Sequence, residues 1–238
     1  MIKIGILPTY NENKKRPFLD SFSFVNNYAD KLTKNKAVPQ GIIFPNGKFQ
    51  KELLKAYDGL LIPGGNTIRS YHLLTIHYAI ENKIPLLGIC MGMQAIGIYS
   101  HIVKKLKSTK QNITYKNIEK LYKNVLEDDY LIKITDHNKE KKFYNSSIHK
   151  ASHKIYITPH TRLYKIYKKA YIMEPSIHNY ALNNISTEFI INARSNEGYI
   201  EGIEHKTKLI IGLQFHPEIE DKNNDLFEYF INHCKDKS

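Results

Sequence analysis

The first ninety residues alternate short, wholly apolar runs with longer amphipathic stretches, and this alternation restricts the possible folds more than any other feature. The stretches with helical periodicity cover about residues 22–36, 48–57 and 69–82. The apolar runs around them are "IKIGILP", "GIIFP", "GLLIPGG" and "PLLGIC". Strands that are apolar on both faces and separated by helices form parallel sheets. The sequence therefore predicts an α/β fold with a doubly wound, mostly parallel sheet and helices on both faces.

The second half of the chain differs in composition, because no glycine occurs between Gly97 and Gly198. Residues 104–150 are rich in Lys and Asn, so we expect a peripheral elaboration there that adds few core residues. Strand patterns return in "HKIYI", "TEFIINARS", "YIEGIEH" and "KLIIGLQF", and a helix is expected over about 225–234. Their hairpin-like spacing predicts a small antiparallel C-terminal portion. No repeat or low-complexity linker divides the sequence, so residues 1–238 are predicted to form a single domain.

Composition and charge indicate which partners and which cellular compartment to expect. The formal net charge is +12, but the lysines are dispersed and no nucleic-acid-binding motif accompanies them, so nucleic acid is not an expected partner. No window approaches the ~18 continuous apolar residues of a membrane helix, and the N-terminus lacks a basic leader, so we expect no membrane association. Two cysteines cannot build a disulfide framework. We therefore expect a cytoplasmic protein.

The segment "LLGICMGMQ" carries one of the two cysteines, Cys90, between Gly88 and Gly92. An apolar strand that enters a helix through this spacing is typical of a nucleophile elbow, with Cys in place of Ser. The positive end of the helix dipole stabilises a thiolate there, and the amide of Met91 would point toward a developing oxyanion. A small buried core residue is the other interpretation of Cys90. The elbow pattern alone does not decide whether Cys90 is a nucleophile or a buried core residue.

A second segment, "LIIGLQFHPEIE", places His216 at the end of an apolar strand and Glu218 two residues later. A His at this position can face the crevice over the elbow and act as a base, while the carboxylate accepts the imidazole N–H. A third segment, "DGLLIPGGNTI", ends a strand in Gly64-Gly65. Its exposed amides can bind an oxyanion, and we expect Gly65, with Gly64 as the alternative, to pair with Met91.

Together "IPGG", "GICMGMQ" and "GLQFHPE", in this order and spacing, resemble a class I glutamine amidotransferase domain, which has a flavodoxin-like fold. The segments "PSIHNYAL" and "INARSNEGYIEGIEH" resemble the branch similar to gamma-glutamyl-gamma-aminobutyrate hydrolase. The resemblance implies a triad of Cys90, His216 and Glu218 that cleaves a γ-glutamyl amide bond through a γ-glutamyl thioester. It implies a small γ-glutamyl substrate and no metal or organic cofactor.

The sequence departs from this branch where a substrate would bind. Met91 stands where the branch usually carries Arg, and its "NSxHxQ" pattern becomes "PSIHNY", with Pro175 and Tyr180 in place of Asn and Gln. We expect these changes to alter which leaving group is accepted. Gln94 is a candidate substrate contact or a helix-capping or core hydrogen-bond donor. His178 is a candidate substrate contact or a surface histidine.

Several functions remain in competition, among them a cysteine esterase on a related fold, which would share the triad but not the "QFHPE" context. The favoured one is a free-standing cysteine hydrolase for a small γ-glutamyl compound. The second keeps this chemistry in a glutaminase subunit that supplies ammonia to a synthase partner. The third is a non-catalytic binding or regulatory protein on the same fold, in which Cys90 would be unreactive. The sequence leaves a homo-oligomer open, and it does not identify the natural γ-glutamyl compound.

Overall fold

The computed structural model describes residues 1–13, 15–124, 130–138 and 151–235. One half of its main sheet is parallel, as predicted, with the strand order β4-β1-β5-β6-β13. These strands are β1 (Lys3–Ile6), β4 (Val38–Gly41), β5 (Gly59–Ile62), β6 (Leu86–Ile89) and β13 (Ile210–Leu213). Every residue of β5, β6 and β13 is buried, which is why they appear in the sequence as unbroken apolar runs.

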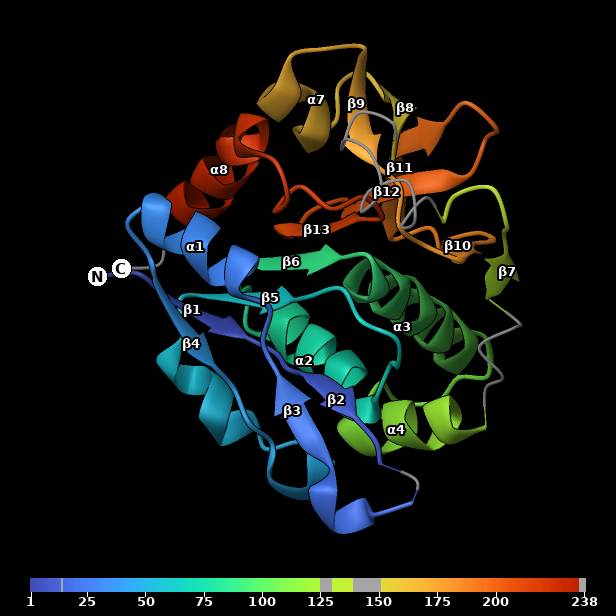
Figure 1. Cartoon of the computed structure of the whole chain (residues 1–238). Helices are drawn as coiled ribbons and strands as arrows, with labels where there is room; N and C mark the ends of the chain where they lie inside the picture. Colours follow the sequence, from blue (N-terminus) through green and yellow to red (C-terminus); the bar gives the residue numbers. More distant parts are fainter. Residues whose placement is uncertain (14, 125–129, 139–150, 236–238) are drawn as a thin grey trace.

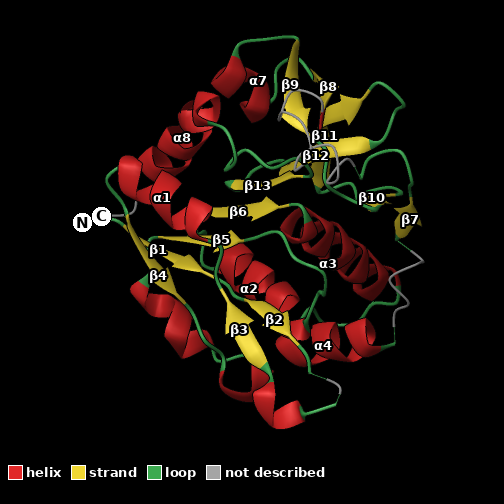
Figure 2. Ribbon diagram, in the orientation of Figure 1, coloured by secondary structure: helices red, strands yellow, loops and turns green. Residues whose placement is uncertain are grey.

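Helices cover both faces of this parallel half (Figures 1 and 2). On one face lie α2 (Ser70–Glu81), α3 (Met91–Ser108) and α4 (Tyr115–Lys123), and on the other lie α1 (Asn26–Lys34) and α8 (Asn224–Lys235). Side chains of β5 alternate between two cores, because Leu60 and Ile62 join the cluster beneath α2 and α3, whereas Leu61 packs with α1 and α8. The predicted doubly wound α/β fold is therefore confirmed.

The other half of the sheet is antiparallel, as predicted, and continues from β13 in the order β12-β11-β8-β9. Its strands are β12 (Ile200–His205), β11 (Phe189–Ser195), β8 (Ser152–Ile157) and β9 (Tyr171–Pro175), with α7 (Arg162–Tyr167) between β8 and β9. Two short strands, β10 (Tyr180–Leu182) and β7 (Leu131–Lys133), extend from β12. β10 thereby lies beside α3, the helix that follows β6 (Figure 1).

Two of the expected helices differ from the structure. The helix expected over residues 22–36 begins only at Asn26, because β3 (Ser21–Ser23) pairs with β2 (Thr9–Asn11) in a separate hairpin. The segment expected as a helix over residues 48–57 forms only the 3₁₀ helix η3 (Lys51–Ala56), in which Leu54 is the one buried side chain. So short a segment with one buried side chain gains too little to nucleate an α-helix.

The elaboration expected at residues 104–150 contributes more to the core than its composition indicates. Its first residues complete α3, and α4 packs on α2 and α3 with Ile118 fully buried. The side chain of Tyr122 on α4 also donates a hydrogen bond to the carbonyl of Ile68, at 2.7 Å. Residues 125–129 and 139–150 of this segment lie outside the described residues.

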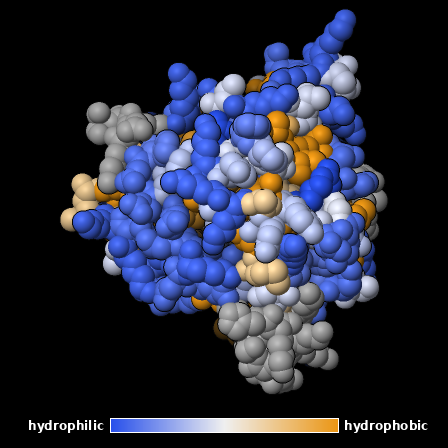
Figure 3. Space-filling view, turned by 90° about the horizontal axis from the view of Figure 1, so that it is seen from above, coloured by the Kyte–Doolittle hydropathy of each residue, from blue (hydrophilic) through white to orange (hydrophobic). Residues whose placement is uncertain are grey.

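Within the described ranges, the remaining short helices are the 3₁₀ helices η1 (Pro17–Leu19), η2 (Pro45–Gly47) and η5 (Asp221–Asn223). Hydrophilic side chains cover most of the face seen in Figure 3, and the apolar patches between them are small. Among the described residues, no helix is long and apolar enough to cross a membrane.

Candidate active site

Three neighbouring parallel strands bring the sequence-predicted residues together. β6 lies between β5 and β13, with Ile62 paired with Gly88 and Leu213 paired with Ile89. Cys90 follows β6 directly, Gly64 and Gly65 follow β5, and His216 follows β13. Because parallel strands end at the same edge of a sheet, the thiol, the glycine pair and the imidazole converge at the carboxyl edge.

The backbone of Cys90 makes the strained turn that the elbow pattern predicts. Its φ is 51° and its ψ is −106°, a conformation that side-chain-bearing residues rarely adopt. Neighbouring interactions hold it there, since the Cys90 N–H donates to the carbonyl of Leu213 at 2.7 Å and its carbonyl accepts from the amide of Gln94 at 3.1 Å. The turn points the thiol out of the strand toward a cavity, with 8% of the residue exposed.

The two glycines that flank Cys90 allow close backbone packing. A Cβ on Gly92 would lie 2.3 Å from the carbonyl oxygen of Ile62, and a Cβ on Gly88 would lie 2.8 Å from the backbone of Gly92. Real Cβ atoms do not approach this closely, so only glycine lets α3 begin against the end of β5. The G-x-C-x-G spacing is therefore explained by the packing of the elbow.

His216 is largely buried and bonded to the carboxylate predicted to orient it. Its Nδ1 lies 2.7 Å from Oε1 of Glu218, whose side chain is 4% exposed. Burial alone would lower the pKa of His216, but the Glu218 carboxylate and the Cys90 sulfur outweigh it and raise that pKa well above its usual value. The imidazole therefore bonds to a carboxylate through Nδ1 and interacts with the Cys90 sulfur, as the base of the expected nucleophile–base–carboxylate triad would.

Tyr28, which the sequence analysis did not single out, supports the glycine turn from α1. Its buried hydroxyl accepts a hydrogen bond from the amide of Gly64, at 3.0 Å. Its pKa is raised well above 10, by burial first and then by the Glu218 carboxylate. Because Tyr28 occupies the Gly64 amide, Gly65 is the better placed of the two glycines to bind an oxyanion. Nothing in the sequence around Tyr28 marks this contact, which depends on the packing of α1 against the turn.

A small cavity of about 220 Å³ opens in front of the Cys90 thiol. The predicted residues Gly65, Met91, Gln94 and His178 line it, and the sequence analysis missed other parts of its wall. The lining residues that were not predicted are Asn66, Ile68, Leu131, Ile177 and Asn179. Of the three positions expected to alter the pocket, Met91 and Tyr180 line the cavity, while Pro175 ends β9 and is not part of the lining.

Gln94 and His178 each engage protein groups as well as facing the cavity. The Gln94 amide nitrogen donates to the carbonyl of Tyr180 and to the Gln214 side chain, both at 3.1 Å. Gln214 in turn donates to the Cys90 sulfur at 3.4 Å. His178 is not a surface residue, because it is 4% exposed and its Nε2 lies 3.3 Å from Nδ1 of His137. These contacts therefore hold the side chains of Gln94 and His178 in place in the wall of the cavity.

The fold and the site together define an α/β protein with a cysteine at a strand–turn–helix elbow and a histidine–carboxylate pair beside it. The family model for class I glutamine amidotransferases matches residues 18–233. The chain belongs to this family, as the resemblance of its motifs indicated. The finer assignment to the branch similar to gamma-glutamyl-gamma-aminobutyrate hydrolase stays a prediction.

Individual proteins that are similar to this chain support the family assignment. A CTP synthase of Methanosphaera stadtmanae is 30% identical across 79% of this chain, which spans only 36% of that relative's length. A protein of Rickettsia prowazekii described as glutamine amidotransferase-like is 28% identical across 94% of this chain and 93% of its own length. The solved glutaminase domain of Trypanosoma brucei CTPS, with bound acivicin, shares the fold with a TM-score of 0.69 at 17% identity, covering all of this chain and 95% of that one.

Proposed function

We propose that this protein is a cysteine-dependent hydrolase that cleaves the γ-glutamyl amide bond of a small γ-glutamyl compound. The observation that carries the proposal is the strained Cys90, which opens to a cavity beside a histidine oriented by Glu218. A binding protein has no need for a thiol, an imidazole and a carboxylate in this register. The two cysteines, both free thiols, favour a cytoplasmic setting.

In the proposed reaction His216 takes the proton of the Cys90 thiol as the sulfur attacks the γ-carbonyl carbon. The amides of Gly65 and Met91 receive the negative charge that develops on the carbonyl oxygen. Met91 is the first residue of α3, so its N–H has no acceptor within the helix. His216 gives its proton to the leaving nitrogen as the C–N bond breaks, which leaves a γ-glutamyl thioester. Water then attacks the thioester, His216 takes the water's proton, and glutamate leaves as the thiol is restored.

The residues that line the cavity indicate the charge and size of the substrate that it can hold. No Asp, Glu, Lys or Arg lines it in the part of the chain that the structure describes. Its polar side chains are the amides of Asn66, Gln94 and Asn179, the Tyr180 hydroxyl and the ring of His178. Neutral hydrogen-bonding groups in so small a space favour a small substrate, and the Met91 and Tyr180 side chains limit the size of the leaving amine.

The second candidate is a glutaminase subunit that supplies ammonia to a synthase partner. It is favoured by the CTP synthase relatives, in which a chain of this length accounts for about a third of the protein. The near full-length match to the Rickettsia protein favours the free-standing hydrolase instead. Glutaminase activity that appears only when a synthase is added would decide for the second candidate.

Covalent labelling tests the proposal. Wild-type protein is incubated with a γ-glutamyl chloromethyl ketone and digested for mass spectrometry, and γ-glutamyl amines are then screened as substrates. We expect one adduct, on Cys90, and loss of both adduct and hydrolysis in Cys90→Ala. Cys234→Ala is the matched control, because that buried thiol lies on α8 away from the cavity. His216→Asn should slow acylation by about a hundredfold or more.

Several results would contradict the proposal. Hydrolysis by the Cys90→Ala variant would remove this thiol from the mechanism. An unlabelled wild-type protein that hydrolyses no γ-glutamyl amide, with or without a synthase, would support the non-catalytic binding protein. An unchanged rate in His216→Asn would mean that another group serves as the base.

A further inference from the structure

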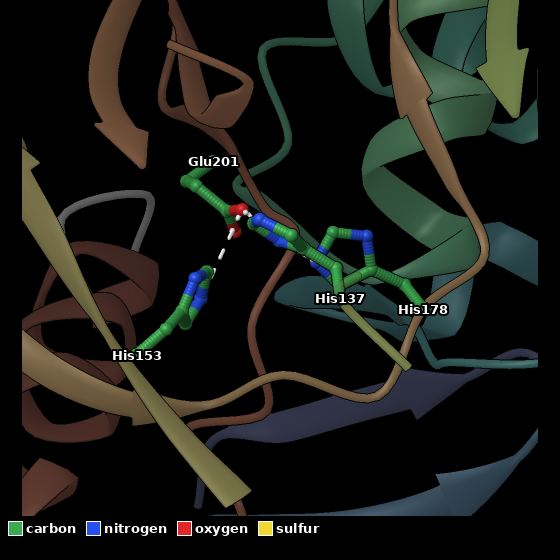
Figure 4. Close-up of side chains that lie close together, drawn as sticks. All are labelled: His137, His153, His178 and Glu201. Atoms are coloured by element: carbon green, nitrogen blue, oxygen red, sulfur yellow. Dashed lines mark hydrogen bonds and ion pairs between the residues drawn. The ribbon is translucent and has the colours of Figure 1, made fainter. Parts of the chain in front are cut away.

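Four buried side chains gather behind the wall of the cavity, on the antiparallel side of the sheet. His137 follows β7, His153 lies on β8, His178 lies between β9 and β10, and Glu201 lies on β12. Their exposed fractions are 2%, 8%, 4% and 0%, and one potential ligand atom from each lies within 4.8 Å of the others. Figure 4 shows the three rings directed toward the Glu201 carboxylate. Only His178 of this cluster lines the cavity, and the proposed hydrolysis gives no role to the other three residues.

The spacing of these atoms is close to that of a tetrahedral metal site. Glu201 Oε1 lies 3.3 Å from His137 Nδ1, 3.5 Å from His178 Nε2 and 3.8 Å from His153 Nε2. The two nitrogens of His137 and His178 are 3.3 Å apart. Zinc bonds of ~2.0–2.1 Å place tetrahedral ligands ~3.3 Å from one another. The His153 nitrogen lies farther out than the other three ligand atoms, so this ring would have to move inward to complete the geometry.

The hydrogen bonds on the far side of two rings fix their tautomers. His137 Nε2 lies 3.2 Å from Oε2 of Glu197, and His178 Nδ1 lies 3.0 Å from the carbonyl oxygen of Tyr180. Both partners are acceptors, so both of these nitrogens carry the hydrogen. In neutral rings, His137 Nδ1 and His178 Nε2 are then lone pairs that face each other. Ligating histidines are oriented in this way by carboxylates and carbonyls behind them.

This arrangement places a buried carboxylate and three imidazole rings around a common point. Neither oxygen of Glu201 makes a hydrogen bond of good geometry within the described ranges, although the side chain is fully buried. A buried carboxylate requires a compensating cation. Three imidazoles and one carboxylate are the ligand set of zinc and similar transition metals, whereas calcium and magnesium prefer oxygen ligands.

We propose that His137, His153, His178 and Glu201 bind a zinc ion in a closed, structural site. Four protein ligands leave no open position, so the ion would not take part in the hydrolysis. Its effect would be on the cavity, because His178 lies between the lining residues Ile177 and Asn179. The carbonyl of Tyr180 also joins the site to Gln94, since it accepts from both the His178 ring and the Gln94 amide. This proposal replaces the expectation that the protein needs no metal.

The test begins with metal-free protein prepared by dialysis against a chelator. Zinc chloride is titrated in by calorimetry, bound zinc is counted by mass spectrometry, and cobalt is added separately to observe its tetrahedral visible spectrum. We expect one zinc per chain and a rise in melting temperature on loading. The same titration in Cys90→Ala excludes zinc held by the thiol, and binding should persist there.

Two variants and one control assign the site. His153→Asn should weaken zinc binding at least tenfold. Glu197→Gln should weaken it by ~10–100-fold through His137, and because the Glu197 side chain is 44% exposed this change leaves folding intact. His101→Asn, which changes a buried histidine on α3 outside the cluster, should bind zinc as wild type does. The proposal is overturned if the wild type takes up no zinc, or if zinc binding is the same in Glu197→Gln as in the wild type.

Discussion

The pH dependence of stability tests whether burial keeps the carboxyl group of Glu174, on β9, protonated. The residue is fully buried, Asn223 donates to its Oε2 at 2.9 Å, and the Lys222 ammonium lies 3.6 Å from its Oε1. Burial raises the pKa of Glu174 from 4.5 to about 7, which is more than Lys222 and Asn223 lower it. The folded protein therefore holds this carboxyl protonated over a range in which the unfolded chain ionises it.

The direction and size of the effect on stability follow from this difference. Because the folded-state pKa is raised, the stabilising contribution is complete below pH 4.5 and is lost as the pH rises through about 7. With these two pKa values, the linkage relation gives a loss of ~2 kcal/mol in the free energy of unfolding between about pH 5.5 and about pH 8.5. Glu174→Gln has no charge at either pH, so its stability should lack this loss.

Urea unfolding followed by circular dichroism, at both pH values and in both proteins, measures the difference. Subtracting the pH-dependent change of the variant from that of the wild type removes the contribution of all other groups. Glu119→Gln is the control, because Glu119 pairs with Lys123 on the surface of α4. If wild type and Glu174→Gln lose the same stability, Glu174 is already ionised at the lower pH and the reasoning from burial is wrong.

Two further predictions concern the elbow and its support. Tyr28→Phe leaves the buried Gly64 amide without its hydrogen-bond acceptor. We therefore expect the free energy of unfolding in urea to fall by ~1–3 kcal/mol and hydrolysis to become slower. Tyr164→Phe, which changes an exposed tyrosine, is the control and should behave as the wild type does. Equal stability of the two variants would show that the Gly64 amide does not depend on Tyr28. Gly92→Ala, which in an ordinary helix would stabilise the protein, should instead destabilise it by ~1–3 kcal/mol, because the new methyl group would meet the Ile62 carbonyl at 2.3 Å. A melting temperature at or above that of the wild type would contradict this packing.

The sequence predicted the parts of the fold that short-range patterns control. Strands buried on both faces appear as apolar runs, and the helices expected over residues 69–82 and 225–234 are α2 and α8, within one residue at each end. The hairpin of β2 and β3 was missed because its pairing joins residues that show no strand pattern. The burial of Ile118 was missed because a Lys/Asn-rich helix can still hold one apolar stripe against a neighbour.

The same distinction holds for the candidate site. Cys90, His216 and Glu218 could be found because each lies in a compact string whose spacing fits a chemical task. Tyr28 could not, since a tyrosine on an amphipathic helix has no local sign of what its hydroxyl contacts. The cluster around Glu201 was missed for a similar reason. Its four members are spread over residues 137–201 without a ligand-binding spacing, and only the pairing of the antiparallel strands brings them together.

The position of β13 in the sheet has a consequence for how the protein is made. Among the strands that the structure describes, β13, which precedes His216, comes last in the sequence, yet it is inserted between β6 and β12. Until it arrives, the edge of the strand that bears the thiol has no partner on one side, and such an edge can pair with other chains. Until β13 is inserted, Cys90 would therefore lack the histidine that the proposed mechanism requires.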